Sequence, residues 1–223
     1  MEQIHGITLL VSKFKDNDSI LNVISEKGPY AILGKGILNY KSKNFKFSHA
    51  FIECDLEIYK GKIGGYKLKD GRICQDFTSL NYDYNFLVYL DFISELTLKT
   101  VDGIDNYEKL FIILKITLEN LKSGLSQLAY YLLVLLDLLG IKPDCGDGFK
   151  YYFDIQNGNF TDFESKNTIL FSVDDYNFIK NVIDNDLIVC NNANFHKIIY
   201  CFYLFLNQKM GVKLNSIDYF VKY

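Results

Sequence analysis

The hydrophobic pattern of this chain changes once, near residue 80, and this change limits the possible folds more than any other feature. Up to residue 78, short runs of apolar and β-branched residues are separated by turn residues, which is typical of β-strands. From about Asn81 onward, apolar residues recur every three or four positions, which indicates amphipathic helices. The sequence therefore predicts an α+β protein, with a β domain over residues 1–78 and a helical domain over residues 79–223.

Five short strands are expected in the first domain, at residues 4–11, 20–25, 30–34, 47–59 and 66–74. The connections between them lack the helical crossovers that join the strands of a parallel sheet. Five strands in such a short span fit a small Greek-key barrel such as an OB-fold. Barrels of this class often bind oligonucleotides across one face and the adjoining loops.

Five helices are expected in the second domain, at residues 84–98, 107–121, 126–139, 174–183 and 195–209. Asp105 is expected to cap the second helix, and Asp174 with Asp175 the fourth, because carboxylates accept hydrogen bonds from the free N–H groups of a first turn. Residues 145–170 break the helical pattern, and Asn157-Gly158 within them is a favoured hairpin turn. We expect a small β-hairpin there, inserted between helices.

The composition is that of a folded protein, because 49% of the residues are apolar and only two are proline. The longest apolar run, Leu128 to Leu139, is shorter than the ~20 residues that span a bilayer, and it is expected to form a buried helix. Glu2 and His5 lie in a strand-like segment, so no signal peptide is expected. Five scattered cysteines without a Cys-x-x-Cys pair suit reduced thiols in a soluble cytoplasmic protein.

Charge is distributed unevenly along the chain. Residues 1–78 carry 12 Lys and Arg against 9 Asp and Glu, a net charge of +3, whereas residues 79–223 carry 12 against 18, a net charge of −6. The first domain is therefore expected to meet an anion, and any contact of the second with DNA must be local.

One segment of the first domain concentrates positive charge next to aromatic rings. Residues 34–47 hold four lysines, three aromatic residues and no carboxylate: Lys35, Tyr40, Lys41, Lys43, Phe45, Lys46 and Phe47. Lysines neutralise phosphates and rings stack on unpaired bases, so the segment predicts a nucleic-acid-binding loop. The alternative is a solvated surface loop whose aromatic residues turn into the core, and for Phe47, which leads into a strand, we expect the core.

Catalytic and metal-binding patterns are not found in the sequence. No Gly-rich loop with a following Lys-Ser/Thr is present, which argues against a P-loop ATPase. His5, His49 and His196 lie far apart and are expected to be satisfied or surface histidines rather than ligands. Asp144 to Gly148 has some likeness to a metal loop but lacks its spacing, so a plain turn is expected. No enzyme activity and no bound cofactor are expected.

The order of short motifs resembles the RecO family of bacterial recombination mediators over nearly the whole chain. Gly6 to Leu10 is similar to the family's first strand, and Lys35-Gly36 with Lys41-Ser42-Lys43 to its basic segment. Leu138 to Pro143 is similar to the end of a helix, and Gly211 to Ser216 to the C-terminal signature. The resemblance implies an OB-like barrel followed by a helical domain.

One family feature, a zinc module made of two Cys-x-x-Cys pairs, differs in this sequence. Cys145 falls at one of the four positions, Lys142 stands at its partner's position, and no cysteine occurs near Thr161 to Glu164. One thiol cannot hold an ion that takes four ligands, so we predict that no zinc is bound. The hairpin of residues 151–163 is then expected to depend on hydrophobic packing.

The resemblance also implies a function in DNA repair without bond chemistry. Members of the family bind single- and double-stranded DNA, anneal complementary strands, and help load recombinase onto DNA coated with single-strand-binding protein. They act with RecR and contact the acidic C-terminal tail of the single-strand-binding protein. The residues of this chain expected to contact DNA are Lys13, Lys15, Lys35, Tyr40, Lys41, Lys43, Phe45 and Lys46.

Two questions stay open at the level of sequence. Lys109, Lys115 and Lys122 could line one helix face and bind the acidic tail, or could simply form the solvated face of an amphipathic helix. The barrel could also be a protein-interaction scaffold with little DNA binding of its own. A hydrolase or nuclease would need a cluster of carboxylates or histidines that the sequence does not show.

Overall fold

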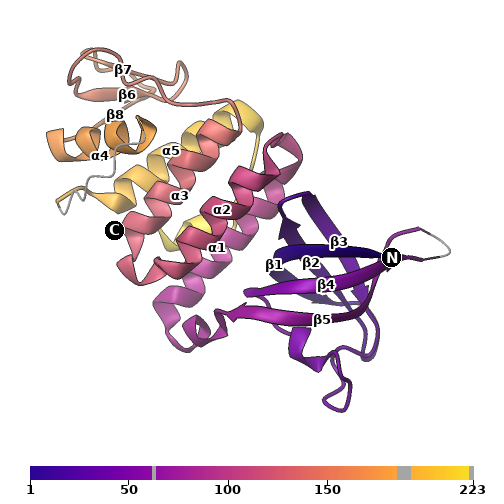
Figure 1. Cartoon of the computed structure of the whole chain (residues 1–223). Helices are drawn as coiled ribbons and strands as arrows, with labels where there is room; N and C mark the ends of the chain where they lie inside the picture. The colour runs from indigo at the N-terminus through magenta and orange to yellow at the C-terminus, as the bar shows by residue number, and fades with distance from the viewer. Residues whose placement is uncertain (62–63, 185–191, 221–223) are drawn as a thin grey trace. The chain divides into compact units, whose positions relative to one another are not determined.

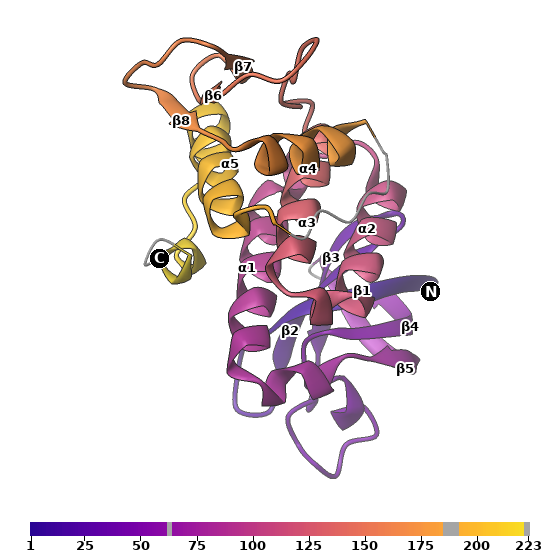
Figure 2. The same cartoon turned by 90° about the vertical axis from the view of Figure 1, so that its left-hand side faces the viewer.

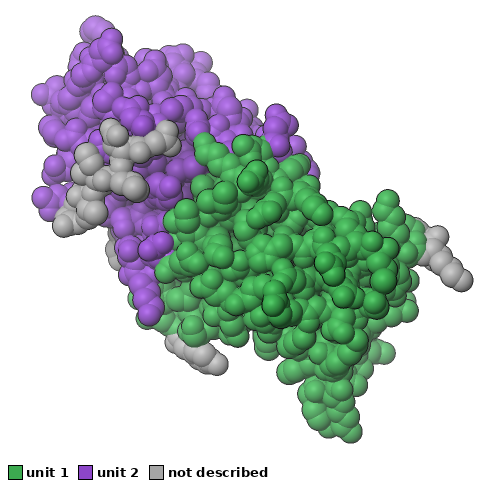
Figure 3. All heavy atoms as spheres, viewed as in Figure 1, with its two compact units in different colours: residues 1–87, 106–119 green, residues 88–105, 120–223 purple. Residues whose placement is uncertain are grey.

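The computed structural model of the chain describes residues 1–61, 64–184 and 192–220. The chain forms two compact units, the first made of residues 1–87 and 106–119 and the second of residues 88–105 and 120–223 (Figure 3). Among the described residues, no helix combines the length and the apolar character needed to cross a membrane. The predicted domain boundary after residue 78 stays a prediction.

The first unit contains a closed five-stranded barrel (Figure 1). Its strands are β1 (Glu2–Lys13), β2 (Ser19–Ser25), β3 (Gly28–Gly34), β4 (Ile52–Lys60) and β5 (Tyr66–Asp76), in the order β1-β2-β3-β5-β4. β1 pairs antiparallel with both β2 and β4, and a short parallel pairing of β3 with β5 closes the barrel. The predicted fold class, with five strands before the helices, is confirmed.

The barrel core consists of alternate strand residues, joined by two side chains from the segment between β3 and β4. Ile4, Leu21 and Ile32 are buried strand residues, and Ile37 and Phe47 are the two that come from the connecting segment. The expectation that Phe47 is a core residue is confirmed. Burying a side chain of this size contributes about 1.5–3 kcal/mol, which anchors the connection to the barrel.

The fourth strand begins later than the sequence predicted. Phe45–Phe47 form a 3-10 turn, and β4 starts at Ile52 instead of at Phe47. Phe51 has φ 61, a left-handed conformation that is incompatible with an extended strand. The expected strand over 47–59 was therefore wrong in its first five residues.

Helix α2 (Tyr107–Glu119) belongs to the first unit. Its Phe111 ring packs edge-on against the imidazole of His5, with 5.3 Å between the ring centroids. The Oδ1 of Asn106 accepts a hydrogen bond from the backbone N–H of Lys109 at 2.9 Å. The cap is thus Asn106, and the expectation for Asp105 was wrong by one residue.

The second unit is mainly helical. It contains α1 (Tyr84–Thr100) from Val88 onward, α3 (Leu125–Leu138), α4 (Val173–Ile183) and α5 (Phe195–Met210). α3 packs against α4 and α5 and is buried along most of its length, which confirms the prediction of a buried helix. Ser172 caps α4 in a capping box with Asp175, so the expected cap at Asp174-Asp175 was wrong, although Asp175 takes part.

A small three-stranded sheet lies in the second unit, with strands β6 (Tyr152–Asp154), β7 (Asn159–Thr161) and β8 (Thr168–Leu170) in the order β7-β6-β8 (Figure 2). The predicted hairpin is β6 and β7, and its turn contains Gly158 at φ 79. The third strand, β8, was not expected. Phe153 and Phe160 are buried and contact the rings of Phe202 and Tyr176, so apolar side chains pack the sheet against α5 and α4, and its dependence on this packing stays a prediction.

Candidate nucleic-acid interface

The lysine-rich segment between β3 and β4, residues 35–47, is here called the basic loop. It is a series of short turns, in which the N–H of Ser42 donates to Asn39 O at 2.8 Å and the N–H of Phe45 to Ser42 O at 3.0 Å. The buried side chains of Ile37 and Phe47 hold its two ends. The four lysines of the basic loop, Lys35, Lys41, Lys43 and Lys46, are all exposed.

Two of the three aromatic side chains of the basic loop are also exposed. Tyr40 is 75% exposed and Phe45 is 37% exposed, whereas Phe47 is buried. The alternative in which the aromatic residues turn into the core therefore applies to Phe47 alone. Tyr40 and Phe45 have ring surface that a base could reach.

The basic loop is tied to strand β5 at its lysine-rich end. Lys43 Nζ lies 2.9 Å from Asp70 Oδ2, and Lys46 Nζ donates to the carbonyl oxygen of Gly71 at 2.6 Å. The hydrogen bond from Lys43 lowers the pKa of Asp70. Glycine at position 71 allows this close approach, because a Cβ there would lie 3.0 Å from the Phe47 ring and closer still to β4. The fold thus supplies a carboxylate to a segment that has none in its own sequence.

The turn between β1 and β2 lies at the same end of the barrel. The strand register places Lys13 opposite Ser19, and Ser19 opposite Gly34, the last residue before the basic loop. The N–H of Gly36 donates to Asp18 Oδ1 at 2.7 Å. The structure therefore brings the exposed Lys13 and Lys15 together with Lys35, as the predicted DNA-binding set requires.

Within the described part of the chain, Lys35 and Lys41 form no ion pair. Lys41 Nζ lies 5.6 Å from the centroid of the Tyr40 ring. These two lysines differ from Lys43 and Lys46, which are engaged by β5. Lys35 and Lys41 are consequently the members of the basic loop whose charge is most available to an anion.

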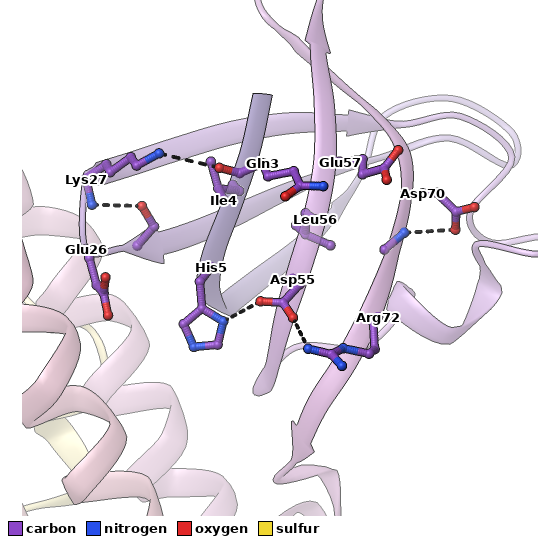
Figure 4. Close-up of a pocket in the computed structure, with 12 residues that line it drawn as sticks. Gln3, Ile4, His5, Glu26, Lys27, Asp55, Leu56, Glu57, Asp70 and Arg72 are labelled. Atoms are coloured by element: carbon purple, nitrogen blue, oxygen red, sulfur yellow. Dashed lines mark hydrogen bonds and ion pairs between the residues drawn. The ribbon is translucent and has the colours of Figure 1, made fainter. Parts of the chain in front are cut away.

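The outer face of the barrel carries a network of charges that the sequence did not reveal (Figure 4). His5 Nδ1 lies 2.8 Å from Asp55 Oδ1, and His5 Nε2 lies 2.9 Å from Glu53 Oε1. Arg72 donates to Asp55 Oδ2 at 2.6 Å, and Lys115 of α2 donates to Glu53 Oε1 at 2.7 Å. Hydrogen bonds from Arg72 and His5 lower the pKa of Asp55 to about 2. Each acid is thus matched by bases from other elements of the unit.

Helix α2 does not present three lysines on one face. It ends at Glu119, so Lys122 lies outside it, in the following 3-10 turn. Lys115 is directed to Glu53, whose hydrogen bond raises the pKa of the lysine. Of the two possibilities left open by the sequence, one helix face lined by Lys109, Lys115 and Lys122 is not formed, because the helix ends before Lys122. Whether any of them binds a partner stays a prediction.

A groove of about 600 Å³ runs beside the charge network, lined by β1, β4, β5 and the turn between β2 and β3 (Figure 4). In the described residues, one group could offer three ligand atoms to a metal ion: His5, Asp55 and Cys74, whose atoms lie within 4.8 Å of one another. Asp55 already accepts hydrogen bonds from His5 and Arg72, and the Arg72 cation opposes a second positive charge. The arrangement fits an ion-pair network better than a metal centre.

The segment with some likeness to a metal loop is held as a turn. Asp144 Oδ1 accepts a hydrogen bond from the N–H of Gly146 at 2.8 Å, which is the geometry of an Asx turn. The carboxylate is thus used locally, in agreement with the turn that was expected.

The fold and the exposed side chains place the protein among those built on an OB-type barrel. A five-stranded barrel of the OB type carries exposed lysines and exposed rings at one end, and helices follow it in the chain. Barrels of this type are a recurrent scaffold for single-stranded nucleic acids.

Comparison with known proteins relates the chain to one family. The family model described as "Recombination protein O C terminal" matches residues 81–177. The chain is 33% identical over 92 residues to the DNA repair protein RecO of Clostridium perfringens, a match over 41% of this chain and 37% of that protein. It is 31% identical over 116 residues to RecO of Mycoplasma capricolum, over 51% of this chain and 46% of that protein.

A longer match extends over residues of both predicted domains. The chain is 28% identical over 171 residues to the DNA repair protein RecO of Christiangramia forsetii, over 73% of this chain and 72% of that protein. In the other two relatives the match spans less than half of the relative's length. The chain is thus similar to RecO DNA repair proteins over as much as 73% of its length, in agreement with the resemblance found in the sequence.

The residues at the family's zinc positions do not fit a zinc ion in this chain. Burial raises the pKa of the Cys145 thiol to about 12, and Cys145 is the one cysteine at the four positions, whereas a structural zinc ion takes four ligands. Lys142 occupies its partner's position and donates to the carbonyl oxygen of Ile183 at 2.8 Å. The expected absence of zinc stays a prediction, for which elemental analysis is the test.

Proposed function

We propose that the chain is a recombination mediator that binds single- and double-stranded DNA, anneals complementary strands and helps load recombinase onto DNA coated with single-strand-binding protein. The observation that carries the proposal is the end of the barrel where Lys13, Lys15, Lys35 and Lys41 are exposed beside Tyr40. The similarity to RecO proteins of three bacteria supports the same function.

Annealing needs no chemical bond to be made or broken, so a site without a catalytic cluster can perform it. Two phosphate backbones repel each other, and lysines reduce this repulsion while releasing bound counterions. Exposed rings hold unpaired bases by stacking, which keeps a strand open to its complement. The lysines and rings at this end of the barrel are the residue types that both steps require.

The partners proposed for this activity are RecR and the acidic C-terminal tail of the single-strand-binding protein. The similarity to RecO proteins supports these partners. The three lysines of the predicted partner site add no support, because they do not share one helix face. We propose a cytoplasmic location, at the nucleoid during repair.

A second candidate function is a protein-interaction scaffold with little DNA binding. The observation in its favour is the net charge of −3, together with a groove on the barrel whose lining mixes acids and bases. Salt dependence separates the two functions, because binding through lysines weakens steeply with salt and binding to an apolar or mixed groove does so much less.

The test is annealing of two complementary oligonucleotides by the wild type and by a Lys35→Ala/Lys41→Ala variant, at low and moderate salt. We expect the wild type to accelerate annealing and the variant to lose most of this effect. Lys166→Ala/Lys213→Ala, which removes the same charge from exposed residues of the second unit, is the matched control and should anneal normally. If the wild type neither anneals nor binds DNA at low salt, the scaffold function is supported instead.

A further inference from the structure

Two lysine–aromatic pairs at one end of the barrel differ from every other such pair in the described residues. Lys15 Nζ lies 5.5 Å from the Phe14 ring centroid, and Lys41 Nζ lies 5.6 Å from that of Tyr40. Phe14 is 53% exposed and Tyr40 is 75% exposed. The remaining pairs use the rings of Phe47, Phe171 and Phe205, which are buried and offer no face to a ligand.

One acidic residue, Asp18, bonds the backbone of Phe14 and also the backbone of Gly36, at the start of the basic loop that carries Tyr40. Its backbone oxygen accepts hydrogen bonds from the N–H groups of Phe14 at 2.9 Å and Lys15 at 3.3 Å. Its carboxylate accepts the N–H of Gly36 at 2.7 Å, and the neighbouring Asn17 O accepts the N–H of Leu38 at 3.0 Å. The β1–β2 turn and the start of the basic loop are therefore one hydrogen-bonded unit.

We propose that Phe14 and Tyr40 are two stacking platforms for unpaired bases, positioned by Asp18, and that they make the site select single-stranded over double-stranded DNA. This inference rests on the proposed DNA binding and deepens it by assigning a strand preference. In a duplex each base already stacks on its neighbours and is paired, so only a single strand can place bases on these rings. Lys15 and Lys41 lie beside the rings, where they reach the phosphates of the same strand.

Holding the two turns together matters for affinity. A ring on a free loop loses conformational freedom when it stacks, whereas a ring fixed in advance does not. The hydrogen bonds to Asp18 fix the backbone on both sides of the site before a strand arrives. Asp18 is thus a positioning residue, which acts through the turns and not by touching DNA.

The first experiment measures the affinity of the full chain for a thymidine 20-mer and for a duplex of the same length, over a range of salt. We expect Phe14→Ala and Tyr40→Ala each to weaken single-strand binding about 5-fold to 150-fold, the effect of one stacked base. The slope of log affinity against log salt should not change, because no lysine is lost. Duplex binding should also be unchanged.

Matched variants separate stacking from folding defects. Tyr40→Phe keeps the ring and should bind like the wild type, and Phe163→Ala, which removes a ring 80% exposed in the second unit, should have no effect. Equal losses for single strand and duplex, or no loss in either ring variant, would overturn the inference while leaving lysine-dependent DNA binding intact. A wild type that binds no DNA would overturn both proposals.

The second experiment asks whether substituting Asp18 weakens or strengthens the binding of single-stranded DNA. Asp18→Ala removes a negative charge, so electrostatics alone predict tighter DNA binding. Loss of the hydrogen bond to Gly36 predicts weaker single-strand binding with an undiminished salt slope, and this is the result we expect. Asp18→Asn also removes the charge but keeps the acceptor oxygen, so it should bind at least as well as the wild type. Tighter single-strand binding by Asp18→Ala would overturn the positioning role.

Discussion

Asp70 offsets part of the positive charge of the basic loop, which we propose binds DNA. Its Oδ2 lies 2.9 Å from Lys43 Nζ, and its Oδ1 accepts the N–H of Gly71 at 2.8 Å. We predict that Asp70→Asn strengthens binding of single-stranded DNA, because Lys43 then becomes free to contact a phosphate. Asparagine keeps the acceptor for Gly71, and the ion pair is exposed, so the fold is not expected to suffer.

The size of the effect follows from counterion release. Each phosphate contact on a single strand contributes about 0.7 to the slope of log affinity against log salt. One additional contact should steepen the slope by about 0.7, which corresponds to about fivefold tighter binding at 0.1 M salt and about threefold at 0.2 M, relative to 1 M. Fluorescence anisotropy of a labelled oligonucleotide, titrated at four or more salt concentrations, measures both quantities.

A double-mutant cycle tests the assignment to Lys43. Lys43→Ala alone leaves Asp70 as an unpaired anion and should weaken binding, whereas Lys43→Ala/Asp70→Asn should return to nearly the wild-type slope. Asp162→Asn removes the same charge from an exposed position in the second unit and controls for net charge. If Asp70→Asn leaves the slope unchanged, or acts equally well without Lys43, the reasoning is refuted.

Three further predictions concern the second unit. The purified protein should contain no stoichiometric zinc by elemental analysis, because Cys145 is the one cysteine where a structural zinc ion would need four ligands; one equivalent per chain would contradict this. Burial raises the pKa of Glu95, but hydrogen bonds from Asn215, Lys99 and Ser216 outweigh it and lower the pKa to about 2. The ionised Glu95 carboxylate should therefore stabilise the fold by at most about 3 kcal/mol above pH 4.5, and this stabilisation should be lost as the pH falls toward 2. The urea unfolding midpoints of the wild type and Glu95→Gln should converge as the pH is lowered, and a constant difference between them would refute this. Phe153→Ala should destabilise the unit by about 3–5 kcal/mol in urea unfolding, because the ring is buried against Phe160 and Phe202, and a loss below about 1 kcal/mol would show that the sheet does not depend on it.

Most elements of the fold were predictable from the sequence, because alternation and helical periodicity are local properties. All five barrel strands and all five helices occur close to their expected positions. Apart from strand β8, which was not expected, the errors lie at the ends of elements, where one residue decides. Phe51 at φ 61 delays β4, and Asn106 and Ser172 cap helices for which neighbouring acids were expected. Backbone conformation and cap geometry at single positions are not encoded in periodicity.

The candidate site was predictable in part. The cluster of lysines and rings is contiguous in sequence, so it could be found without a structure. Phe14 was missed because a single aromatic residue in a turn has no distinguishing pattern, although the adjacent Lys13 and Lys15 were a signal. The network around His5 was missed because its partners, Glu53 and Asp55, are 48 and 50 residues away.

The sequence by itself determined the α+β class, the five-stranded barrel, the helices and the position of the basic loop, since each depends on neighbouring residues. Only the tertiary structure decided which charges remain available. It paired Lys43 with Asp70 and Lys115 with Glu53, and joined the β1–β2 turn to the basic loop through Asp18. The reason is physical: closing a barrel sets residues from distant strands side by side, and their electrostatic energy depends on separation in space and not along the chain.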